Sequence, residues 1–136
     1  MNKKRLMTKM KSVRDATLEH GNHTRCEDCK IRDVCNHFLS RAYRNNPSLV
    51  IECSWVFLIA VATGRIYRTG RLRKMKNYQM DACNELFNHF VAFRKKYGSK
   101  CHECPISMEC TQLNHGCYFS FILCVMFGII DVYENQ

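Results

Sequence analysis

The sequence has few of the residues that interrupt regular structure. It contains two Pro and six Gly among 136 residues. This scarcity excludes a low-complexity or disordered chain, because such chains are enriched in both residues. Hydrophobic residues make up 46% of the chain, which is enough for a modest core. A chain of this length forms one domain or two very small ones, and small domains often gain stability from disulfides or metal ions.

Long apolar runs are also missing. The two most apolar stretches, residues 49–63 and 117–130, are shorter than the roughly 18 residues that a membrane-spanning helix needs. Glu52 interrupts the first of them. We therefore expect two buried core helices and no membrane partner. No apolar segment of the signal-peptide kind follows the basic N-terminus, so we expect a cytoplasmic protein.

Sequence signatures of catalysis are absent as well. The chain has no Gly-rich phosphate loop and no HExxH motif. A Cys-x-x-Cys redox pair is typical of a βαβ context, and no such pattern surrounds the Cys pairs of this chain. We therefore expect that the protein is not an enzyme and has no small-molecule substrate.

Cysteine, in contrast, is abundant. Six of the ten Cys form two copies of C-x2-C-x5-C, which are Cys26, Cys29 and Cys35, and then Cys101, Cys104 and Cys110. In each copy an acid precedes the second Cys, and an Ile (Ile31 or Ile106) stands two residues after it. Without a secretory signal, such a pattern indicates metal binding rather than disulfides.

The similarity between the two halves extends beyond the clusters. When Cys53 is aligned with Cys117, further pairs match, namely Phe57 with Phe121, Val61 with Val125 and Gly64 with Gly128. An internal repeat of this kind indicates a duplicated structural unit. We predict a mainly α fold of two pseudo-repeated helix–Cys-cluster–helix modules that share one small core. The first module with its basic connector spans residues 1–76, and the second spans residues 77–136.

The repeat predicts four thiol ligands in each module. They are Cys26, Cys29, Cys35 and Cys53 in the first module, and Cys101, Cys104, Cys110 and Cys117 in the second. Cys83 and Cys124 are interpreted as small buried hydrophobic residues, although Cys83 is also an alternative to Cys117. A Cys3His zinc site is the main alternative ligand set. Its histidine would be one of those near the clusters, which are His23, His37, His102 and His115.

Four thiolates suit either a zinc ion or a [4Fe–4S] cluster. Zinc typically takes its thiolates as two close pairs, whereas each module here has one close pair and two single thiols. A [4Fe–4S] cluster presents four separate irons and does not need paired ligands. We predict two [4Fe–4S] clusters, with two Zn²⁺ ions as the alternative.

The C-x2-C-x5-C motif with one remote Cys resembles the cluster motif of WhiB-type transcription regulators. It is also similar to the iron staple of some DNA nucleases and helicase–nucleases. The resemblance covers about ten residues in each module and implies an iron–sulfur cluster. In those families the remote Cys precedes the triplet, whereas the repeat places it after the triplet here. The Gly-rich Trp motif of WhiB proteins and the acidic constellation of nucleases are absent.

Positive charge is concentrated in the first half of the chain. The net charge is +9, with 17 Lys and Arg against 6 Asp and Glu in residues 1–76, but 4 against 6 in residues 77–136. This asymmetry indicates an anionic partner for the first half. Residues 65–76 contain six of these cations and no acid, and they are the predicted connector between the modules.

The connector has two interpretations, a solvated linker and an arm that contacts phosphates. The predicted nucleic-acid-binding residues of the arm are Arg65, Tyr67, Arg68, Arg71, Arg73, Lys74 and Lys76. Tyr67 would stack on a base. Cations near the N-terminus would extend the arm, namely Lys3, Lys4, Arg5, Lys9 and Lys11.

Three functions are consistent with these features. The first is a small intracellular regulator that binds nucleic acid or the transcription machinery and carries two structural or redox-sensing metal sites. The alternative is a metal-stabilised interaction, inhibitor or assembly component whose partner is an acidic protein. The third is an electron carrier with two clusters.

The hydrophobic spacing also predicts individual helices. They span residues 3–19, 36–44, 47–63 and 77–97, and a last apolar segment covers residues 117–132. Gly21 is expected to end the first helix. Asn46 as N-cap, Pro47 at the first helical position and Gly64 past the end frame the third. The fourth carries the apolar stripe Cys83, Leu86, Phe87, Phe90, Phe93 and Tyr97.

Overall fold

The computed structural model describes residues 2–23, 25, 27, 29, 31–64 and 77–131, and this part of the chain is mainly helical, with no strand. Its α-helices are α1 (Lys3–His23), α2 (Arg32–Asn45), α3 (Cys53–Ala62), α4 (Asn77–Tyr97), α5 (Ser107–Leu113) and α6 (Cys117–Met126). A short 3₁₀-helix, η2 (Cys101–Glu103), lies between α4 and α5. The predicted mainly α fold is therefore confirmed.

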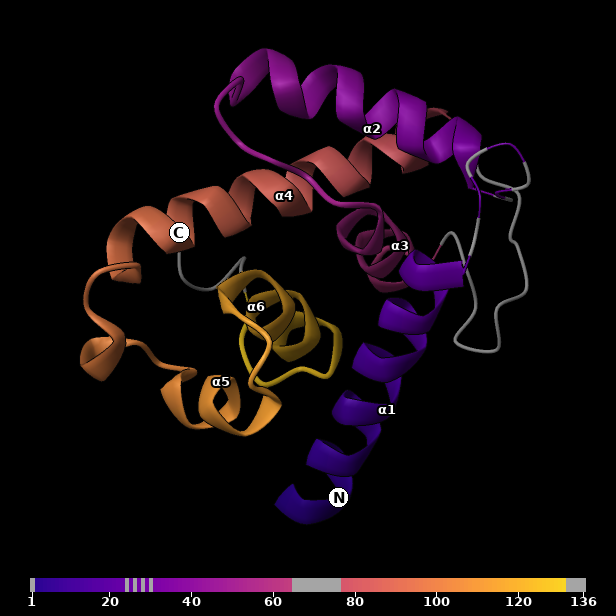
Figure 1. Cartoon of the computed structure of the whole chain (residues 1–136). Coiled ribbons are helices and arrows are strands. Elements are labelled where there is room, and N and C mark those ends of the chain that lie inside the picture. Colours follow the sequence, from indigo (N-terminus) through magenta and orange to yellow (C-terminus); the bar gives the residue numbers. More distant parts are fainter. Residues whose placement is uncertain are drawn as a thin grey trace.

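Helix α6 lies at the centre of the molecule and contacts α1, α3, α4 and α5 (Figure 1). Its residues 118–124 are buried without interruption, as expected for a helix that is apolar on every side. Helices α3 and α6 both pack against α4 and also against each other. Within the described residues, no helix combines the length and the apolar character that crossing a bilayer requires.

Aromatic side chains fill the space between α3, α4 and α6. The rings of Trp55 and Tyr118 stack with centroids 4.1 Å apart, and Phe90 meets Tyr118 edge to face at 5.1 Å. The Tyr118 hydroxyl donates a hydrogen bond to the Trp55 carbonyl at 2.6 Å, so its only polar group is satisfied inside the core. Burial raises the pKa of Tyr118 well above its ordinary value, which keeps the hydroxyl protonated and able to donate.

Helix α4 has the predicted bounds, and its predicted stripe faces the core. Cys83, Phe87, Phe90 and Phe93 are buried, and the remaining two stripe residues pack against the core at its edge. The helix ends at Tyr97, and the Gly98 N–H still donates to the Arg94 carbonyl at 2.7 Å, as in the last turn of a helix. A Cβ at this position would lie only 2.5 Å from that oxygen, so the tight closing turn requires glycine.

The predicted start of the helix at residues 47–63 is wrong. Helix α3 begins at Cys53, after an extended Glu52 at its N-cap. Asn46 instead follows the end of α2, where its N–H donates to the Ala42 carbonyl at 2.9 Å. Because a residue before proline is disfavoured in the helical region, Pro47 keeps Asn46 out of that region, with φ −140° and ψ 67°, and thereby stops α2. The predicted end is confirmed, since Gly64 follows α3 with a φ of 85°.

The prediction that Gly21 ends the first helix is also wrong, because α1 continues to His23. Gly21 lies where α1 passes close to α3. A Cβ on Gly21 would be 3.4 Å from the Ser54 Cβ, which is ordinary van der Waals contact. The glycine is accommodated inside the helix at a modest cost in stability.

The predicted connector, residues 65–76, lies outside the described residues. The boundary between two units at residue 76 stays a prediction. On the described part, one cluster of buried side chains draws members from both sides of this segment, including Met10, Phe38, Phe90 and Phe121. The first and last thirds of the described chain thus bury their apolar faces together.

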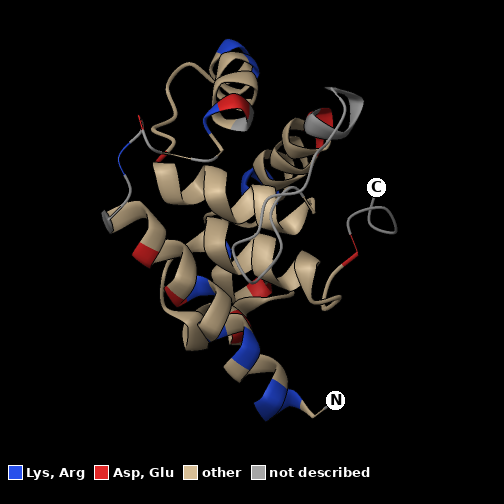
Figure 2. Cartoon of the chain, turned by 90° about the vertical axis from the view of Figure 1, so that its right-hand side faces the viewer, with Lys and Arg blue, Asp and Glu red and all other residues tan. Residues whose placement is uncertain are grey.

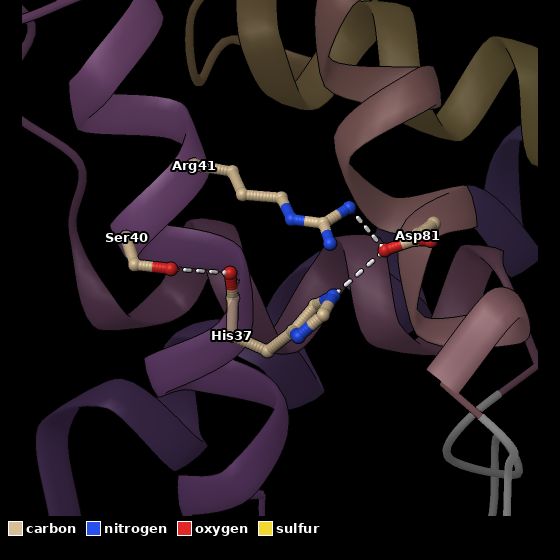
Figure 3. Close-up of polar contacts among 4 residues, drawn as sticks. All are labelled: His37, Ser40, Arg41 and Asp81. Carbon is tan, nitrogen blue, oxygen red and sulfur yellow. Dashed lines mark hydrogen bonds and ion pairs between the residues drawn. The ribbon is translucent and has the colours of Figure 1, made fainter.

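A small polar cluster joins α2 to α4 at the surface (Figure 3). Asp81 accepts a hydrogen bond from His37 Nε2 at 2.8 Å and pairs with the guanidinium of Arg41. The Asp81 and Arg41 side chains are almost half exposed, and exposed ion pairs contribute little stability. Replacing Asp81 with Asn should therefore lower the free energy of unfolding by less than about 1 kcal/mol in urea titrations. A loss above about 2 kcal/mol would show that the cluster holds α2 in place.

Candidate metal centres

The second Cys cluster forms a compact turn between α4 and α6. The N–H of Cys104 donates to the Cys101 carbonyl at 3.2 Å, and the N–H of Ser107 donates to the Cys104 carbonyl at the same distance. Ile106 is buried and anchors this turn in the core. Cys110 follows on α5, one helical turn further, and Cys117 is the first residue of α6.

The thiols of the second module lie close enough to influence one another. The pKa of Cys117 is raised to about 11, first by burial and then by the negative charges of Cys110 and Cys104. Arg94 opposes this shift, and Cys101 adds to it. All four predicted ligands of this module are therefore electrostatic neighbours at the junction of η2, α5 and α6.

Cys124 lies beneath this group, two turns along α6 from Cys117. Its pKa is raised to about 12 by burial and by the nearby charges of Glu109, Cys110 and Cys104. The side chain has no exposed surface, so the prediction of a buried small residue is confirmed.

Cys83 is likewise buried, which confirms its predicted place in the core. Its Sγ lies 3.2 Å from the Thr63 hydroxyl at the end of α3, and burial raises its pKa. Cys83 therefore contacts the C-terminal end of α3, through the hydroxyl of Thr63. Cys117, not Cys83, is the thiol beside the second cluster.

In its described residues, the first Cys cluster repeats two backbone hydrogen bonds of the second. The N–H of Arg32 donates to the Cys29 carbonyl at 3.3 Å, and the N–H of Cys35 donates to the Ile31 carbonyl at 2.8 Å. Ile31 is buried and has φ −108° and ψ 20°, close to the −115° and 23° of Ile106. Cys26 lies outside the described residues. Cys53, the fourth predicted ligand, is exposed at the start of α3.

The histidines considered as alternative ligands have other neighbours where they are described. His37 bonds to Asp81, and His102 is exposed 3.9 Å from Glu103. The ring of His115 meets the edge of Phe119 at 4.7 Å. The His23 side chain lies outside the described residues.

His20, which the sequence reasoning missed, is the histidine beside a cluster thiol. Its Nε2 lies 3.7 Å from Cys29 Sγ, and its ring stacks on Phe57 of α3 at 4.1 Å. Burial lowers the pKa of His20, which favours the neutral ring. Helical spacing could have predicted this position. His20 lies three residues after Thr17 and ten after Met10, so it shares the inner face of α1 with these two buried residues.

The donor chemistry of the second module fits a sulfur-ligated centre. No two of the nine described cysteines are joined by a disulfide. Among the described residues, no three His, Cys, Asp or Glu side chains are arranged around a single ion position.

In the metal-free protein, the raised thiol pKa values make stability depend on pH. The folded state holds the protons of Cys117 and Cys124 to about pH 11 and 12, whereas the unfolded chain releases them near the ordinary thiol pKa of about 8.5. The unfolding free energy should therefore be level below about pH 8 and fall as the pH rises toward 11. Urea titrations of metal-free protein will measure this, with a Cys117→Ser/Cys124→Ala variant as control. An equally steep fall in that variant would contradict the assignment.

The predicted phosphate-contacting arm cannot be placed, because all seven of its residues lie in the part outside the described residues. The N-terminal cations that would extend it are described on α1. Lys3, Lys4, Arg5 and Lys9 are exposed, and Lys11 is partly exposed. Figure 2 shows basic residues gathered at the N-terminal end of this helix. The first turn of α1 holds no acidic residue to balance them.

Comparisons with known proteins yield no relative. No protein-family model, no curated protein and no solved structure matches the chain. Function is therefore inferred from the residues of this chain alone.

Proposed function

We propose that this chain is a small Cys-cluster metalloprotein that regulates by binding nucleic acid or the transcription machinery. The observation that carries the proposal is the neighbourhood of four thiols at the junction of η2, α5 and α6. These are Cys101, Cys104, Cys110 and Cys117. Each module would hold one metal centre. A [4Fe–4S] cluster is the proposed occupant, with Zn²⁺ as the alternative, because both take four thiolates.

A duplicated architecture is part of this proposal, and the ends of the two core helices support it. Helices α3 and α6 each span ten residues and begin with a predicted ligand Cys. Thr63 and Phe127 follow them with nearly the same backbone angles, φ −92° and ψ 2° against φ −96° and ψ 9°. Gly64 and Gly128 come next, with φ of 85° and 75°.

The helix contacts support the same duplication. Exchanging α1 with α4, α2 with α5, and α3 with α6 maps the main contacts between the described α-helices onto one another, and the contact between α3 and α6 onto itself. The packing of α1 on α3 corresponds to that of α4 on α6, and the packing of α2 on α4 corresponds to that of α5 on α1. Helices α3 and α6 correspond to each other and lie face to face. Such an exchange describes an approximate two-fold relation between the modules.

The proposed role of the metals is to fasten each Cys turn to a core helix. In the second module, Cys101, Cys104 and Cys110 come from η2, the turn after it and α5, whereas Cys117 comes from α6. A centre bound to all four would tie these segments together. Because ligand thiols must lose their protons, metal binding supplies folding free energy and depends on pH.

The charge on α1 supports an anionic partner. Lys3, Lys4 and Arg5 occupy the first turn, where the helix dipole disfavours cations. No acid precedes Asp15 in the sequence. The first turn has no acid of its own, and Glu109 of α5 lines the same groove as Lys3 and Lys4. The remaining excess of positive charge favours an external polyanion, whose phosphates attract cations without regard to sequence.

Nucleic-acid binding is tested by removing these charges. A Lys3→Gln/Lys4→Gln/Arg5→Gln variant should bind duplex DNA and single-stranded RNA more weakly, and the salt dependence of log K should flatten by roughly 0.7–0.9 for each lost phosphate contact. Substituting Arg68, Arg71 and Arg73 in the predicted arm should weaken binding in the same way. Fluorescence anisotropy at several salt concentrations measures both.

A matched control separates this effect from net charge. A Lys95→Gln/Lys96→Gln/Lys100→Gln variant removes the same charge from exposed positions near the end of α4. It should bind as the unmodified protein does. Equal weakening in both triple variants, or unchanged binding after the α1 and arm substitutions, would contradict a specific phosphate surface.

A groove between α1 and α5 favours an acidic protein as the second candidate partner. Its lining combines lysines with flexible methionines, including Lys4, Lys11, Met7 and Met108, and it also holds the acid Glu109. Methionine adapts to varied apolar partners, and the lysines would meet acidic side chains. Binding to one acidic protein, without affinity for DNA or RNA, would favour this candidate.

A further inference from the structure

One residue of α1 beside the first Cys cluster, His20, has a counterpart of different chemistry on α4. When Met10 is aligned with Cys83 and Thr17 with Phe90, all four of which are buried, His20 aligns with Phe93. Both rings pack against corresponding residues of the core helices. His20 stacks on Phe57, and Phe93 contacts Phe121 with centroids 4.8 Å apart. The second module thus has a hydrocarbon ring where the first has an imidazole.

The imidazole of His20 is placed as a metal ligand would be. Its Nε2 is 3.7 Å from Cys29 Sγ. In a tetrahedral zinc site, Zn–S of about 2.3 Å and Zn–N of about 2.0–2.1 Å place the two ligand atoms roughly 3.5–3.6 Å apart. The observed separation is close to this value, and it also suits a hydrogen bond between the thiol and the ring nitrogen. The stack on Phe57 orients the plane of the ring.

We propose that His20 and Cys29 bind the same metal ion, so that the first module holds a centre with nitrogen and sulfur ligands while the second holds sulfur ligands alone. This inference rests on the proposed function, because it assumes that both modules bind metal. A mixed nitrogen–sulfur ligand set favours zinc in the first module, since Cys3His is a common structural zinc site. The two centres would then differ in metal and in redox behaviour.

Two substitutions of His20 separate a ligand from a packing residue. His20→Phe copies the second module and keeps a ring on Phe57, but it removes the nitrogen. His20→Cys loses the ring and supplies a thiol that can bind metal. We expect His20→Phe to lose the metal of the first module and His20→Cys to retain it. A packing role predicts the opposite order, with the Phe variant intact and the Cys variant weakened.

Protein purified without oxygen would be measured for zinc and iron content and by X-ray absorption at the edge of each metal. The unmodified protein should show nitrogen at one of its two metals, and this signal should disappear in His20→Phe. Cys110→Ser should remove the other, sulfur-only centre. Full metal content and an unchanged absorption spectrum in His20→Phe would overturn the inference and leave the proposed function standing. Absence of metal from the unmodified protein would instead overturn the proposed function itself.

Discussion

Replacing Cys110 with serine should empty the second metal centre and destabilise the whole chain. Cys110 is one of the four neighbouring thiols, and its helix α5 packs on α1 and α6. Structural metal sites of this kind bind with roughly 10–16 kcal/mol, and much of that free energy is folding free energy. Removal of one thiolate should therefore cost several kcal/mol. Metal content and urea-denaturation midpoints of protein purified without oxygen will measure the effect.

Cys124 provides the matched control for this experiment. It lies near Cys110 and Cys104 but is fully buried behind them. Cys124→Ala should keep all the metal and lose only about 1 kcal/mol, since it removes one small buried group. If the alanine variant loses metal while Cys110→Ser keeps it, Cys124 is a ligand and the predicted set is wrong.

Replacing Phe90 with alanine should destabilise the protein by about 3–5 kcal/mol, as other Phe truncations in protein cores do. The ring is buried and contacts Trp55, Tyr118, Phe87 and Phe121, with centroids 5.1–6.0 Å apart. It therefore joins α4 to both α3 and α6, and its loss leaves a cavity where the three helices meet. Because small domains have only about 5–15 kcal/mol of stability, the variant should be partly unfolded at 37 °C.

The control for Phe90→Ala is a large apolar residue at the surface. Met108 is 63% exposed, so Met108→Ala should change the unfolding free energy by less than about 0.5 kcal/mol. Thermal and urea unfolding followed by circular dichroism will compare the variants, each at the same metal occupancy. A loss below about 1 kcal/mol for Phe90→Ala would show that the aromatic cluster repacks around the cavity.

Patterns that repeat within one element were predictable from the sequence. The stripe of α4 depends on helical periodicity alone, so both its bounds and its buried residues were predicted. The apolar runs that form α3 and α6 were identified as core helices because nothing but burial suits their composition. Turn chemistry was harder to interpret, since Asn46 and Pro47 suit either the end of one helix or the start of the next.

Contacts between distant segments were not predictable. Gly21 predicts the end of a helix from the sequence, yet α1 continues through it to His23, where the helix packs beside Ser54 of α3. His20 was passed over because histidines nearer to the Cys clusters in sequence were weighed instead. Only the packing of α1 on α3 brings its ring to Phe57 and Cys29.

The sequence by itself determined that the protein is helical, rich in paired thiols and basic in its first half, because these properties follow from residue spacing and composition. Only the tertiary structure decided which side chains meet. It placed Cys110 and Cys117 together and set His20 beside Cys29, since α5 folds back on α6 and α1 lies against α3. These contacts depend on how whole helices pack against each other. Packing between helices that are distant in the sequence cannot be predicted from local residue patterns.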